Sequence, residues 1–229
     1  MIKSQSRWGA KLALACYLVL FVVVLIVYGA MRFIGLGFPF PIGLVVVPIE
    51  QIIFVAITFL FATYKGAGFK ELGLKKVMPK TLTIVSIVAV LLYLLSAVIM
   101  FVLTNLFGSP PGVDEYIELI MPRDSFQLIA LVFINLAIVG ICEELAFRGF
   151  IQKGFQNSFG KIKGLLTASV LFGLPHVFNS PYNVATAFVG GLFLGYVWQK
   201  TDENTTASAV MHGLLNSISF ILAYFIGRS

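Results

Sequence analysis

The sequence predicts an all-α, polytopic membrane protein with about seven transmembrane helices. Hydrophobic residues make up 59% of the 229 positions, charged residues only 11%, and the mean hydropathy is +0.98. Soluble domains carry roughly 25% charged residues, so one soluble core could not bury this much apolar surface. Long stretches without charge approach the ~20 residues that a spanning helix needs. We therefore expect residues 1–229 to form a single integral membrane domain embedded in lipid.

The expected spans follow from these uncharged stretches. Residues 164–199 contain no Asp, Glu, Lys or Arg and are long enough for two spans joined by a turn at NSPYN (179–183). The basic stretch before the first span resembles the start of a signal peptide, but the apolar run is long and no small-residue cleavage site follows it, so we expect it to be retained. The other five spans are residues 12–31, 41–64, 81–107, 125 into the segment ICEELAFRGF (141–150), and 205–226.

Loop charges predict the orientation of the chain. Basic residues gather before the first span, between the second and third, and after the fourth, where Arg148 is one of them. The loop with Asp114, Glu115, Glu118 and Asp124 is acidic. The positive-inside rule then places the N-terminus in the cytosol, and the short loops indicate a bacterial cell membrane. The net charge of +6 is thus a matter of orientation, and no basic and aromatic surface suggests a nucleic-acid partner.

Two further patterns concern packing and redox chemistry. Ala187, Gly191 and Gly195 are four residues apart and form a small-residue face suited to close helix packing. Cys16 and Cys142 both lie in apolar segments, so a disulfide framework is not expected.

Ionisable residues inside spans are costly and therefore point to function. Glu144 and Arg148 are four residues apart in the order that favours an ion pair on one helix face. Glu143 lies about 100° further around the helix and keeps an unpaired, poorly solvated carboxylate, which suits a general base. The alternative is a helix end decorated with charge.

The only two histidines are the second element of the predicted site. His176 follows Phe172 by one helical turn, and His212 precedes Asn216 by one turn on another helix. These side chains could converge with Glu143 between helices. Ideal helix rises of about 1.5 Å per residue, however, place the three at depths that differ by about 10 Å. Glu50 is either a helper in the site or an interfacial residue near a helix end, and we expect the second.

The three motifs EExxxR (Glu143, Glu144, Arg148), FxxxH (Phe172, His176) and HxxxN (His212, Asn216) occur in this order within about residues 125–220. They resemble the motifs of the CPBP family, which contains CAAX prenyl endopeptidases of the Rce1 type, bacteriocin-processing or immunity proteins and Abi membrane proteins. The segment KELGLKK (70–76) is similar to a stretch that often precedes this core.

The resemblance implies an intramembrane endopeptidase acting on a membrane-associated, lipidated or secreted peptide or protein. Glu143 and His176 would activate a water molecule, and His212 and Asn216 would stabilise the oxyanion. The other motif residues, Glu144, Arg148 and Phe172, would support the site.

Other chemistries remain open at this stage. Glu143, His176 and His212 form a possible zinc set with an open position. We expect a metal-free site, because Asn216 is a natural oxyanion donor but a poor zinc ligand. A non-catalytic bacteriocin-immunity or membrane-sensor protein of the same fold is the main alternative. An ion transporter is disfavoured by the lack of inverted repeats.

Overall fold

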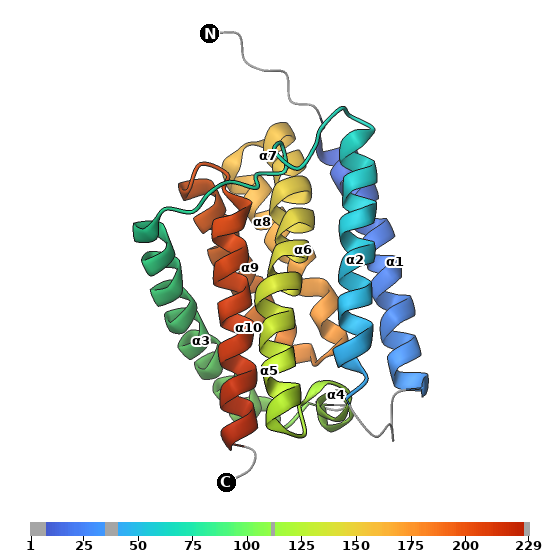
Figure 1. Ribbon diagram of the computed structural model, residues 1–229, viewed down its shortest axis with the longest axis vertical. Coiled ribbons are helices and arrows are strands. Elements are labelled where there is room, and N and C mark those ends of the chain that lie inside the picture. Colours follow the sequence, from blue (N-terminus) through green and yellow to red (C-terminus); the bar gives the residue numbers. More distant parts are fainter. Residues whose placement is uncertain (1–7, 35–40, 111–112, 227–229) are drawn as a thin grey trace.

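The computed structural model describes residues 8–34, 41–110 and 113–226. Regular structure in these ranges is helical, without strands, and the long helices run side by side along the molecule (Figure 1). This confirms the all-α membrane class. The helices are α1 (Ala10–Ile34), α2 (Gly43–Thr63), α3 (Pro79–Phe107), α4 (Val113–Ile120), α5 (Ser125–Ile134), α6 (Gly140–Glu144), α7 (Lys153–Phe159), α8 (Lys161–Gly173), α9 (Pro181–Lys200) and α10 (Thr205–Ile226).

Five segments of the described chain are long and apolar enough to cross a membrane. They coincide with five of the expected spans, and the fourth extends further than predicted. The remaining two expected spans correspond to α8 and α9, which are not among the five, so the total of seven stays a prediction. The five are Ala10–Phe33, Gly43–Thr63, Pro79–Phe107, Ser125–Phe159 and Thr205–Ile226.

The two ends of the helical bundle differ in charge. The start of α1, the segment between α2 and α3, and the α9–α10 turn lie at one end, which carries most lysines (Figure 1). The opposite end holds α4 and the acidic loop around it. Arg148, which we counted with the basic end, is instead fully buried inside the protein. Which end faces the cytosol stays a prediction.

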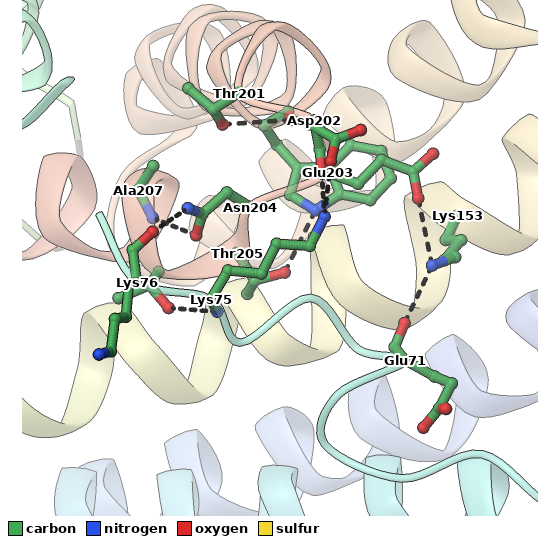
Figure 2. A network of polar contacts seen from close by, with 12 residues as sticks. Glu71, Lys75, Lys76, Lys153, Thr201, Asp202, Glu203, Asn204, Thr205 and Ala207 are labelled. Atoms are coloured by element: carbon green, nitrogen blue, oxygen red, sulfur yellow. Dashed lines mark hydrogen bonds and ion pairs between the residues drawn. The ribbon is translucent and has the colours of Figure 1, made fainter. Parts of the chain in front are cut away.

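Hydrogen bonds tie the segment between α2 and α3 to the start of α10 (Figure 2). The backbone N–H of Thr205 donates to the Gly73 carbonyl at 2.8 Å, and its hydroxyl donates to the Leu72 carbonyl at 2.6 Å. From α7, the Lys153 ammonium donates to the Glu71 carbonyl at 2.9 Å. The KELGLKK segment therefore links the first turn of α10 to the start of α7.

Replacing Thr205 by valine should weaken this junction. The Thr205 side chain is fully buried, and its hydroxyl also accepts a hydrogen bond from the Trp198 indole at 3.2 Å. Thr205→Val keeps the shape but strands the Leu72 carbonyl and the indole N–H, which should cost about 1–3 kcal/mol. Thermal unfolding in detergent measures this loss. Thr83→Val, at an exposed position of α3, is the matched control, and an equal loss in both variants would contradict the prediction.

A continuous helical segment of 35 residues, Ser125–Phe159, carries the EExxxR motif. Two π-helical runs, Asn135–Val139 and Leu145–Gln152, interrupt it on either side of α6. Such π turns occur frequently at functional sites. Because the segment continues to Phe159, Glu143 lies near its middle, roughly 25 Å from either end.

The predicted difference in depth between the site residues is therefore wrong. Leu72 contacts both Thr205 and Gly149, where an added Cβ would come within 2.5 Å of the Leu72 carbonyl oxygen. The first turn of α10 thus begins beside Gly149, well inside the end of α7, and His212 reaches the level of Glu144. The α8 helix ends at Gly173 and continues as a 3-10 turn through Pro175, which carries His176.

The small-residue face of α9 packs closely, as its spacing predicts. A Cβ on Gly191 would lie 3.1 Å from the Ser169 backbone, and one on Gly195 would lie 2.5 Å from the Leu165 side chain. Both neighbours belong to α8. Ala187 packs against the same hydrophobic core. This contact holds the His176-bearing turn against the rest of the bundle.

Candidate active site

Glu144 links two helices at the centre of the protein. Its Oε2 accepts a hydrogen bond from Arg148 Nε at 3.0 Å, and its Oε1 accepts one from His212 Nδ1 at 3.1 Å. The side chains of Glu144 and Arg148 are both fully buried. The ion pair expected from the spacing is present. The bond to His212 was missed, because the sequence does not show that α10 packs against α6.

The ring of Phe172 contacts three of the polar side chains. Its centroid lies 4.9 Å from the Arg148 guanidinium carbon, 5.2 Å from the His176 ring and 5.6 Å from the His212 ring. A cation over an aromatic face is stabilised by the ring quadrupole. Phe172 therefore contacts both imidazoles and covers the buried cation.

Glu143 has different surroundings from Glu144, as the 100° offset predicts. Its side chain is 19% exposed, and its Oε2 lies 4.0 Å from His212 Nε2. Its Oε1 accepts a hydrogen bond from Gln51 Nε2 at 3.2 Å. The carboxylate thus lies between an amide donor from α2 and an imidazole from α10.

The two histidines have distinct hydrogen-bonding roles. His176 Nδ1 lies 2.9 Å from the Phe172 carbonyl oxygen, which can only accept, so this nitrogen carries a proton and Nε2 is the basic atom of the neutral ring. The ring of His212 has a carboxylate near each nitrogen, Glu144 at 3.1 Å and Glu143 at 4.0 Å. The ring of His212 therefore lies between the carboxylates of two consecutive residues.

A cavity of about 580 Å³ joins these side chains. The four residues with predicted catalytic roles, Glu143, His176, His212 and Asn216, all line it. It extends from them to α4, where Tyr116 and other residues form its far wall. The polar side chains therefore face a space large enough for part of a peptide, and this space continues toward the acidic end of the bundle.

Three cavity residues were absent from the predicted site or placed elsewhere. Gln51 is 2% exposed and contacts Glu143. Glu50, expected near the membrane interface, lines the same cavity. Asn135 is buried in the first π-helical run and also lines it. An adjacent Glu and Gln within an otherwise apolar span was the signal that could have identified the α2 contribution.

The donor set does not fit zinc as it stands. Among the described residues, no group of three or more His, Cys, Asp and Glu side chains is arranged to hold a metal ion. We therefore derive no chemical step through a metal.

Comparison with known families gives one match. The model of the family described as type II CAAX prenyl endopeptidase Rce1-like matches residues 125–218. The matched segment is similar to this family over less than half of the chain. The match agrees with the CPBP resemblance, and the segment contains Glu143, His176, His212 and Asn216. No curated protein and no solved structure matches the chain.

The segment that matches the Rce1-like model does not supply every residue of the cavity. Its match begins at α5, so α1 to α4 lie outside it, yet Glu50 and Gln51 come from α2. The upstream helices therefore form part of the candidate active site as well as part of the membrane anchor.

Gln51→Met should lower turnover about tenfold or more. Methionine has a similar volume but removes the donor to Glu143, and a hydrogen bond to a charged group contributes about 1.5–3 kcal/mol. The measurement separates kcat from KM, and we expect the loss in kcat. Thr58→Val is the matched control, since Thr58 is buried on the same face of α2 but does not line the cavity. Unchanged kcat in Gln51→Met would show that the bond has no part in turnover.

Proposed function

We propose that this protein is an intramembrane endopeptidase that hydrolyses a peptide bond with a water molecule activated by Glu143 and His176. The observation that supports this most is the cavity itself. Three separate helical segments bring a carboxylate, two imidazoles and an amide to its wall. A carboxylate and an imidazole that hold one water form a general-base arrangement.

In the proposed first step, water binds between Glu143 and His176 Nε2. Its oxygen attacks the scissile carbonyl carbon while one proton passes to the Glu143 carboxylate. The carbonyl oxygen becomes an oxyanion, which accepts hydrogen bonds from protonated His212 and the Asn216 amide. Each such donor contributes up to about 3–4 kcal/mol to the stability of the transition state.

In the second step the tetrahedral intermediate collapses. The carbon–nitrogen bond breaks, and the proton held by Glu143 passes to the departing nitrogen, which leaves as an amine. The second product is a carboxylic acid that keeps the other proton of the water and loses it to solvent on release, and Glu143 returns to its ionised form. Glu144, Arg148 and Phe172 touch no reacting atom in this scheme. They hold the ring of His212 in place.

The substrate is a membrane-associated, lipidated or secreted peptide or protein whose scissile bond enters the cavity between the helices. The test uses the full-length protein, purified and reconstituted in lipid, with a library of apolar and lipidated peptides. We expect mass spectrometry to detect discrete cleavage products with the wild-type protein and none with Glu143→Ala. Binding without cleavage would favour the immunity or regulatory alternative.

We expect full activity without a metal ion. The scheme requires only side chains of this chain, and Asn216 supplies an oxyanion donor where a zinc site would need a ligand. The measurement is elemental analysis of the enzyme after exhaustive chelation, beside its turnover. Activity at well below one zinc per chain agrees with the proposal. Loss of activity that returns in proportion to added zinc would recast Glu143, His176 and His212 as ligands.

A further inference from the structure

The cavity wall carries a carboxylate, Glu50, whose charge no neighbouring cation offsets. The lining also includes Glu143, and no Lys or Arg occurs among its described residues. The imidazole of His212 lies between Glu143 and Glu144, so it does not offset the charge of Glu50. Glu50 has no hydrogen bond or ion pair with any described residue. A carboxylate in a membrane-embedded cavity is costly unless it is neutralised by a proton or paired with a cation.

A buried acceptor atom without a partner lies on the residue next to Glu50. The adjacent Gln51 side chain is 2% exposed, and its Oε1 has no hydrogen-bond partner among the described residues, while its Nε2 is used by Glu143. Tyr28, Tyr93 and Tyr116 also line the cavity, and aromatic faces attract cations. This wall is therefore complementary to a group that carries a positive charge and several N–H donors.

The surface at the same end of the protein has matching charge. The cavity extends to α4, whose exposed face carries Asp114, Glu115 and Glu118, and Asp124 follows nearby. Arg32 and Arg123 offset only part of this charge. Negative potential at the mouth of a cavity raises the local concentration of cationic ligands.

We propose that Glu50 forms a subsite that binds a lysine or arginine side chain of the substrate close to the scissile bond. This proposal rests on the proposed function, in that the bound peptide is the substrate. Glu50 directly precedes Gln51, which contacts Glu143, so the cationic residue lies near the bond that is cut. An acidic side chain at the same position is disfavoured, because it would face two carboxylates.

The cleavage test compares peptides that differ at one position. A peptide cleaved by the reconstituted protein is prepared with lysine, norleucine or glutamate at each position flanking the scissile bond, and kcat/KM is measured. We expect one position at which lysine exceeds norleucine about tenfold or more. Glu50→Gln removes this preference, Glu50→Asp retains it, and Glu50→Lys transfers it to the glutamate peptide. Asp202→Asn, which removes an exposed carboxylate at the opposite end of the bundle, keeps the wild-type ratio. An unchanged ratio in Glu50→Gln overturns the proposal.

A binding test separates this proposal from the proposed function. Short apolar peptides with one central lysine or norleucine are titrated, by fluorescence anisotropy, into Glu143→Gln with and without Glu50→Gln. We expect the lysine peptide to bind about tenfold more tightly only when Glu50 is present. Such selectivity without cleavage by the wild type would reject the peptidase and keep the cation site. Cleavage by the wild type with no Glu50-dependent selectivity in either test would support the peptidase and reject the cation site.

Discussion

Glu143→Gln abolishes peptide cleavage and leaves the protein folded and inserted in the membrane. Glutamine has the size of glutamate and can still accept a hydrogen bond from Gln51 Nε2, which donates to Oε1 of Glu143 at 3.2 Å. It cannot take a proton from water. Loss of a general base lowers the rate by about 10²–10⁴. The measurement is turnover of a cleaved peptide beside the thermal unfolding midpoint in the same detergent.

Glu144→Gln is the informative comparison. It makes the same chemical change one residue later, but in a carboxylate that is fully buried between Arg148 and His212. We expect this variant to lose stability as well as activity, whereas Glu143→Gln loses activity alone. Wild-type turnover retained above a few per cent in Glu143→Gln would remove the residue from the proposed role.

Most of the fold could be predicted because it depends on composition. In a charge-free stretch long enough to cross a bilayer, a helix satisfies the hydrogen bonds of the backbone within the segment itself. Five such stretches coincide with spans in the structure. The ends of helices depend instead on tertiary contacts. The segment at Ser125 continues to Phe159 because α1 and α8 pack along its last turns, and the start of α10 is set by hydrogen bonds to Leu72 and Gly73.

The features of the candidate site that depend on spacing along a single helix could be predicted from the sequence. The offset between Glu143 and Glu144, and the pairing of Glu144 with Arg148, follow from helical geometry and are present. Contacts between helices were missed. The bonds of His212 to Glu144 and of Gln51 to Glu143 join residues 68 and 92 positions apart, and no local pattern encodes them. The π-helical runs at 135–139 and 145–152 were missed for the same reason.

Arg148→Ala should destabilise the protein by about 3–5 kcal/mol, because it leaves a buried carboxylate without its counter-ion. The guanidinium donates to Glu144 at 3.0 Å and stacks over Phe172, and the side chain has no exposed surface. Its loss should also lower activity, since Glu144 is the partner that fixes His212 Nδ1. Expression level, the unfolding midpoint in detergent and turnover measure the three effects.

A double variant decides whether the cost comes from the unpaired charge. Nη1 and Nη2 of Arg148 have no hydrogen-bond partner among the described residues, so the pair already leaves part of the cation unsatisfied. Replacing both residues, as Arg148→Met with Glu144→Gln, removes the charge and keeps most of the volume. We expect it to recover more than half of the stability that Arg148→Ala loses, because a neutral pair has little to desolvate. Activity should not return, since His212 lacks its anionic partner. Lys163→Ala, at an exposed position, should change neither quantity. An unfolding midpoint of Arg148→Ala equal to that of Lys163→Ala would show that the buried pair does not stabilise the fold.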